Sequence, residues 1–203
     1  MFKKMGDDFD YINYDYKSNI KVANKLDYMP KIYTINFWHE FDSDASLYAP
    51  YFDVLEKAKE HDEIIFYFNS CGGSITTLNL FLNALRRCKS KHILAKVNYA
   101  ASAAALMALF CDNIEFNTNS TLMLHTFSSI EFGKGQEIES SFMHAKQEYE
   151  GLIKLICSKI LSKEEIEQLL NGKDFYFNGR EAIERLKKRA KEIEKEMKRK
   201  VKK

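Results

Sequence analysis

The chain has 203 residues, of which 45% are hydrophobic and 13% aromatic, enough to bury the core of one large domain. Its net charge of +2 is uneven, because residues 185–203 carry eleven Lys or Arg against three Glu and leave residues 1–184 at −6. The four cysteines form no C-x-x-C pair, and no segment has the pattern of a signal peptide or a bilayer-spanning run. We therefore expect a cytoplasmic protein without disulfides or a membrane partner.

The first third of the chain alternates between expected strands and helices. Residues 1–30 have no sustained periodicity and are interpreted as an N-terminal arm. Residues 31–38 alternate and are rich in β-branched and aromatic side chains, which predicts the first core strand. Residues 42–58 combine capping residues with helical spacing, and Pro50 falls early in that helix, where a missing N–H costs least. Residues 64–68 form a continuous apolar run that predicts a strand covered on both faces.

The same alternation continues through the middle of the chain. Apolar spacing predicts a helix over residues 75–87, a strand over 92–97 and a further helix from Ser102. Two short strands are expected at 114–116 and 122–124. Strands that alternate with helices imply right-handed βαβ crossovers and a mostly parallel sheet, so we predict an α/β fold.

The last third is expected to be mostly helical. An apolar stripe predicts a long helix over residues 138–160, and Ser162 to Glu165 form a capping box that begins a short helix. Asn178 to Glu181 have the same form and begin the last helix. Its basic end has apolar residues in alternating four- and three-residue steps, typical of a docking helix, although a solvated charged helix fits as well. The expected division is an arm at 1–30, a main domain at 31–184 and a basic helical tail at 185–203.

Ser102 is the first candidate for chemistry. It follows an expected strand, opens an apolar helix and lies between alanines that would let a substrate backbone approach. The turn would expose its hydroxyl at the positive end of the helix, which suits a nucleophile. Alternatively, the alanine-rich stretch is a buried helix whose serine bonds a carbonyl one turn back. These residues alone leave both interpretations open.

Two further features fit a nucleophilic serine. The glycines of Asn69-Ser70-Cys71-Gly72-Gly73-Ser74-Ile75 lie between a strand and a helix, where backbone amides can point outward and bind an oxyanion. No lysine follows them, so a phosphate-binding loop is disfavoured. His125 directly follows the strand at 122–124, where it can serve as a general base or as a structural histidine. The other histidines are not spaced as metal ligands, and we expect no metal and no cofactor.

Four segments together resemble the ClpP family, the proteolytic subunit of Clp proteases. They come in that family's order, with 29 residues from Gly73 to Ser102 and 49 from His125 to Asp174. The segments are Asn-Ser-Cys-Gly-Gly-Ser-Ile at 69–75, Tyr-Ala-Ala-Ser-Ala-Ala at 99–104, Met-Leu-His at 123–125, and Asp-Phe through Glu-Ala at 174–182.

The resemblance implies a ClpP/crotonase-like α/β fold with a long handle helix and a C-terminal charged helix. It implies a serine endopeptidase that acts through an acyl-enzyme on peptides or unfolded proteins. Carried over residue by residue, Ser102 is the nucleophile, His125 the general base and Asp174 the residue that orients the imidazole. The amides of Gly73 and Ala103 would form the oxyanion hole, and Gly72 and Ser74 would contact the substrate.

The resemblance also implies homo-oligomeric rings around a chamber, joined by the helix at 138–160, with residues 131–135 near a substrate-docking strand. The arm does not match the loops with which that family meets its ATPase unfoldase, which puts such a partner in question. Cys71 stands where that family has a proline before the Gly-Gly pair. The basic tail stands where that family has its last strand. These departures indicate a divergent member, of the kind carried by some phages. A nucleic-acid partner is not expected, since the tail has no interleaved aromatics.

Three alternatives stay open at this point. A phage-type head-maturation protease of the same fold would carry the same site. A crotonase-type acyl-CoA enzyme would use backbone oxyanion holes and a carboxylate near the Gly-Gly loop, with no serine nucleophile. An inactive ring or scaffold subunit would use the basic tail to dock an acidic partner.

Overall fold

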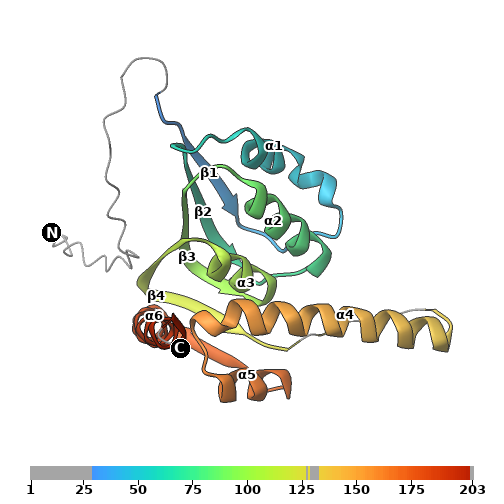
Figure 1. The fold of residues 1–203 in the computed structure, drawn as a ribbon. Coiled ribbons are helices and arrows are strands. Elements are labelled where there is room, and N and C mark those ends of the chain that lie inside the picture. The colour runs from blue at the N-terminus through green and yellow to red at the C-terminus, as the bar shows by residue number, and fades with distance from the viewer. Residues whose placement is uncertain (1–28, 127, 129–132, 202–203) are drawn as a thin grey trace, which may run out of the picture.

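A five-stranded sheet runs through the molecule, and its spatial order repeats the sequence order (Figure 1). The computed structural model describes residues 29–126, 128 and 133–201. The first four strands are parallel and the last is antiparallel, which confirms the predicted α/β class. The strands are β1 (Ile32–Phe37), β2 (Glu63–Ser70), β3 (His92–Ala101), β4 (Asn113–Leu124) and β5 (Phe175–Asn178).

Helices join each pair of parallel strands, and α1, α2 and α3 lie on one side of the sheet (Figure 1). The side chain of Ser162 accepts from the N–H of Glu165, whose carboxylate accepts from the N–H of Ser162, so the predicted capping box is confirmed. The elements are η1 (Ala45–Tyr48), α1 (Ala49–Lys57), α2 (Ile75–Arg87), α3 (Ser102–Phe110), α4 (Gly135–Ile156), η2 (Cys157–Lys159), α5 (Lys163–Leu170) and α6 (Gly179–Val201).

The helix predicted over residues 42–58 is divided. Asp44 caps a 3-10 turn, η1, by accepting a hydrogen bond from the N–H of Ser46 at 3.0 Å. The α-helix begins only at Ala49, with Pro50 in its first turn as predicted.

The two short strands predicted at 114–116 and 122–124 are one strand, β4. The polar residues between them are also extended, and their extra length shifts the register against β3 after Val97. Ser120 stabilises this irregularity: its hydroxyl donates to the carbonyl of Val97 and accepts from the N–H of Asn117.

The prediction that β2 is covered on both faces was wrong. Ile64, Phe66 and Phe68 are fully buried beneath the helices, whereas Ile65 and Tyr67 on the other face are only half-buried. A continuous apolar run shows only that both faces are apolar, and in the single chain one of them is partly open to solvent.

The long helix α4 is buried over its C-terminal half alone. Tyr149, Ile153 and Ile156 are buried in the core. Phe142, which belongs to the predicted apolar stripe, is 38% exposed, and the first turns of α4 extend beyond the other elements (Figure 1). The helix begins at Gly135, and its last predicted turn is the 3-10 segment η2.

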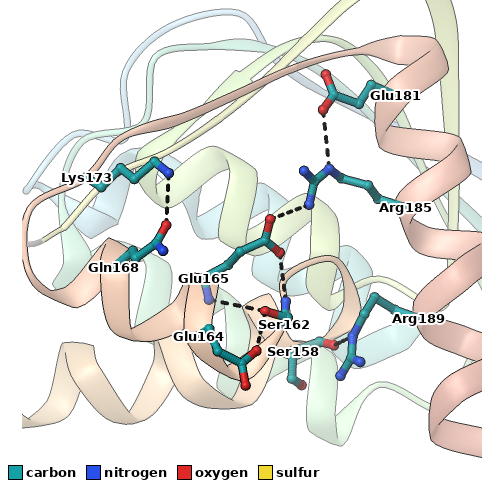
Figure 2. A network of polar contacts seen from close by, with 9 residues as sticks. All are labelled: Ser158, Ser162, Glu164, Glu165, Gln168, Lys173, Glu181, Arg185 and Arg189. Atoms are coloured by element: carbon teal, nitrogen blue, oxygen red, sulfur yellow. Dashed lines mark hydrogen bonds and ion pairs between the residues drawn. The ribbon is translucent and has the colours of Figure 1, made fainter.

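A polar network attaches α5 to α6 (Figure 2). Arg185 donates to Glu165 of α5 at 2.8 Å and to Glu181 at 3.3 Å. Arg189 donates to the carbonyl of Ser158 at 3.2 Å. These contacts fix the first turns of α6, which continues through the start of the basic tail without a break.

Two expectations concern residues outside the described ranges. The N-terminal arm falls almost wholly in residues 1–28, and residues 131–135, expected to lie near a docking strand, begin in a segment that is likewise not described. In the part of the chain that is described, no helix combines the length and the apolar character needed to cross a bilayer.

Candidate active site

Ser102 occupies the turn from β3 into α3. Its φ of 54° makes it the one non-glycine residue with a positive φ among the described residues. Such a conformation is strained for an L-residue and is frequent at functional sites. Ser102 is partly exposed while Ala103 through Leu109 are buried, so the turn brings one hydroxyl out of the core. Ala101 at the N-cap has no side-chain acceptor for the first N–H groups of α3, which therefore remain available to a ligand.

The Gly-Gly loop is held against a segment that follows β1. The N–H of Phe41 donates to the carbonyl of Gly72 at 2.5 Å, and the N–H of Ser74 donates to the carbonyl of Phe41 at 2.8 Å. This parallel bridge does not use the N–H of Gly73. Ser70 tightens the arrangement by donating to the carbonyl of His39 at 2.6 Å.

Gly72 brings the loop into direct contact with the Ser102 turn. A Cβ at Gly72 would lie 2.7 Å from the carbonyl oxygen of Ala101, 2.7 Å from the Cβ of Ser102 and 2.9 Å from the nitrogen of Ala103. Its φ of +101° is also one that glycine adopts most readily. No other side chain fits there, and the Gly-Gly loop therefore lies beside the Ala103 amide, where the oxyanion hole was predicted.

A cavity of about 380 Å³ joins the predicted nucleophile and base. Ser102 and Gly73 reach it from the two loops, and the half-buried His125 reaches it from the end of β4. Three of the predicted site residues, far apart in sequence, thus share one space. The described residues that line it are Glu40, Cys71, Gly73, Ile75, Ser102, His125, Thr126, Ser128 and Tyr149.

Asp174 and Ser74 are placed differently. The β4–β5 ladder ends at the pair Leu124 and Phe175, and His125 and Asp174 are the next residues beyond this pair on the two segments. The Asp174 side chain is exposed, does not line the cavity and forms no ion pair with His125 within this part of the structure. Ser74 caps α2 by accepting from the N–H of Thr77 at 3.2 Å.

The family model for Clp protease matches residues 22–185. The chain belongs to the Clp protease family. No curated protein matches the chain. The family, together with the sheet and helices described above, confirms the ClpP/crotonase-like fold and identifies a ClpP-like peptidase. In the described part of this Clp protease family member, no three His, Cys, Asp or Glu residues are grouped so as to hold a metal ion.

Tyr149 is a site residue that sequence reasoning missed in this family member. Its side chain is 2% exposed, and its hydroxyl donates to the main-chain oxygen of His125 at 3.2 Å. Burial is the main cause that raises the pKa of Tyr149, and the neighbouring Ser102 side chain acts in the opposite direction. The apolar stripe of α4 predicted that Tyr149 would be buried, but nothing in the pattern indicated where its hydroxyl would point.

Glu40 and Cys71 were missed as well. The thiol of Cys71 donates to Oε1 of Glu40 at 3.2 Å. Burial, with the adjacent carboxylate, raises the pKa of the Cys71 thiol. A raised pKa keeps this thiol protonated near neutrality, so Cys71 is a poor competitor of Ser102 as a nucleophile.

Lys159 caps the C-terminus of α3, the helix that begins at Ser102. Its ammonium donates to the carbonyl of Leu109 at 2.7 Å and to that of Cys111 at 3.3 Å. Burial lowers the pKa of Lys159. A cation at the C-terminus of α3 satisfies its last carbonyls, while the N-terminus remains free to face an anion at Ser102.

Proposed function

We propose that this Clp protease family member is a serine endopeptidase that hydrolyses peptide bonds through an acyl-enzyme on Ser102. The observation that carries the proposal is the partly exposed Ser102, on a strained turn, in one cavity with His125 and the Gly-Gly loop. A nucleophile, a base and unpaired backbone N–H groups in one space are the parts that acyl transfer requires.

In the proposed reaction, Oγ of Ser102 attacks the carbonyl carbon of the scissile bond while its proton passes to His125. The N–H groups of Gly73 and Ala103 stabilise the negative charge on the carbonyl oxygen. The intermediate collapses, the C–N bond breaks, and His125 gives the proton to the leaving amine. A water molecule, deprotonated by His125, then attacks the ester, and release of the acid restores Ser102.

Asp174 is proposed to orient His125 in the reacting state. The positions of both residues directly beyond the last ladder pair support this role, since a change of side-chain rotamers would bring the two groups closer. Asp174→Asn is expected to lower the rate at which Ser102 reacts with a probe by about a hundredfold or more. Asp53→Asn, at an exposed position on α1, serves as the matched control and is expected to keep the wild-type rate.

A fluorophosphonate probe tests the assignment directly. We expect labelling of the wild type at Ser102 and loss of both labelling and peptidase activity in Ser102→Ala, while Ser141→Ala at an exposed position of α4 keeps both. Peptide mapping locates the label, since the hydroxyl of Ser128 lines the same cavity. Labelling that persists in Ser102→Ala would refute the proposal, and acyl-CoA turnover without labelling would favour a crotonase-type enzyme.

The active form is proposed to be a ring of identical subunits. Large apolar side chains at the surface of the single chain support this, among them Ile32 on β1, 66% exposed, and Met143 on the projecting part of α4. Static light scattering at micromolar concentration is expected to give a multiple of the 23.7 kDa chain mass, and a monomer would argue against a ring. A degradative Clp-type subunit and a head-maturation protease would share this site and assembly.

A further inference from the structure

We propose that the cavity at Ser102 selects substrates with a lysine or arginine side chain next to the scissile bond, and that Glu40 determines this preference. The inference rests on the proposed peptidase function and names the substrate class of the same site. Glu40 contributes the one carboxylate among the described residues that line the cavity, and no lysine or arginine is among them.

The backbone of Glu40 is fixed relative to the reacting groups. The carbonyl of the preceding residue, His39, accepts from Ser70, and the following residue, Phe41, forms the bridge to the Gly-Gly loop. The hydroxyl of Tyr48 donates to the carbonyl of Glu40 itself at 3.2 Å. The loop that Phe41 holds is the one that contacts Ser102 through Gly72. Glu40 therefore has a defined place beside the reacting serine, although its side chain is exposed.

The carboxylate of Glu40 retains capacity for a ligand. Cys71 donates to Oε1 through a thiol, which is a weak hydrogen-bond donor. No hydrogen bond or ion pair to Oε2 occurs among the described residues. The Cys71 contact keeps the carboxylate in the cavity wall without neutralising its charge.

The Glu40 carboxylate in the cavity wall is best suited to bind a cationic side chain. A guanidinium can bind a carboxylate through two parallel hydrogen bonds, and an ammonium through one. The hydroxyls of Thr126 and Ser128 line the same cavity and offer further acceptors. An acidic substrate side chain would instead meet a like charge. Because Glu40 is open to solvent, the expected discrimination is on the order of tenfold, and added salt should reduce it.

Fluorogenic peptides that differ only in the residue on the acyl side of the scissile bond test the inference. We expect kcat/KM for the Arg and Lys peptides to exceed that for the norleucine peptide by about tenfold, with the Glu peptide lowest. Glu40→Gln should bring the Arg-to-norleucine ratio close to one, and Glu40→Lys should place the Glu peptide above the Arg peptide. Glu167→Gln removes one exposed carboxylate from α5 and should preserve the wild-type ratio.

The outcomes separate this inference from the proposed function. Hydrolysis that depends on Ser102 but shows no preference for Arg, or a preference that survives in Glu40→Gln, would overturn the inference and leave the peptidase assignment standing. Failure of Ser102 to react with either peptides or fluorophosphonate would overturn the assignment, and the inference with it.

Discussion

The hydroxyl of Tyr149 bonds the main-chain oxygen of His125 at 3.2 Å, so the long helix α4 is attached to the end of β4 at the candidate base. Tyr149 also lines the cavity that Ser102 reaches from a third element. One buried phenol thus bonds the backbone of the candidate base in the cavity of the candidate nucleophile.

Tyr149→Phe removes that hydroxyl and retains the buried ring. We expect the labelling rate of Ser102 and kcat/KM to fall by about five- to tenfold, since one hydrogen bond contributes about 1 kcal/mol. KM should change little and the pH profile of kcat/KM should shift, because the change concerns the position of His125 and not substrate binding. Tyr176→Phe, at an exposed position of β5, is the control. An unchanged pH profile and rate would show that Tyr149 only fills space.

Gly72→Ala is expected to abolish labelling of Ser102. The added Cβ would lie 2.7 Å from both the Ala101 carbonyl and the Ser102 Cβ, and backbone atoms cannot move aside cheaply. Gly172→Ala is the matched control, because Gly172 also has a positive φ, +96°, but nothing lies within 4 Å of its Cβ position. Backbone strain should cost both variants about 1 kcal/mol of stability, and the clash should cost Gly72→Ala more, while only this variant loses activity. Equal labelling of the two variants would contradict the contact between the loop and the serine turn.

The Ser102→Gly variant should have a higher free energy of unfolding than the Ser102→Ala variant. A φ of 54° costs an L-residue about 1–2 kcal/mol, and glycine carries no such penalty. Part of this gain is offset by the greater freedom of glycine in the unfolded chain. We therefore expect Ser102→Gly to unfold at higher denaturant concentration than Ser102→Ala, with both inactive. The reverse order would mean that the turn is not strained.

The network in Figure 2 predicts a loss of stability at acid pH. Burial alone would raise the pKa of Glu165, but the hydrogen bond from the Ser162 N–H and the Arg185 guanidinium lower it below its usual 4.5. A carboxyl whose pKa is lower in the folded state contributes stability above the unfolded pKa, and this contribution is lost as the pH falls.

Denaturation measured at several pH values tests the network. The free energy of unfolding should fall less steeply in Glu165→Gln than in the wild type as the pH decreases below about 5. At neutral pH this variant should be less stable by about 1 kcal/mol. Glu167→Gln, on the same helix but exposed, should follow the wild-type curve. Parallel curves for Glu165→Gln and the wild type would exclude a contribution from this carboxylate.

Local patterns were enough to predict most of the elements. The apolar spacing of α2 and the capping box at Ser162 and Glu165 depend on neighbours a few residues away, and both are confirmed. The order of strands and helices predicted the parallel sheet, and the glycine pair with Ser102 and His125 marked the three segments that meet at one cavity.

Features that depend on distant parts of the chain were not predicted. The polar stretch within β4 is extended, and its Ser120 hydroxyl bonds the carbonyl of Val97 on another strand. Glu40 lies in a segment without periodicity, and its place at the cavity depends on contacts with distant residues, such as the bridge from Phe41 to the Gly-Gly loop. Asp174 and His125 come directly after the last pair of the β4–β5 ladder, yet the role of Asp174 stays a prediction, since rotamers are not encoded in spacing.

The helix behind the reacting serine has no solvent-facing side chain from Ala103 through Leu109. Substitutions in this buried helix would disturb the packing of the core and destabilise the fold. Substrate preference is therefore difficult to change by substitutions in that helix. We expect divergence among relatives to accumulate instead at positions 40, 126 and 128, which line the cavity at Ser102. Two such proteins can then differ in substrate preference while keeping the same Ser102 turn and Gly-Gly loop.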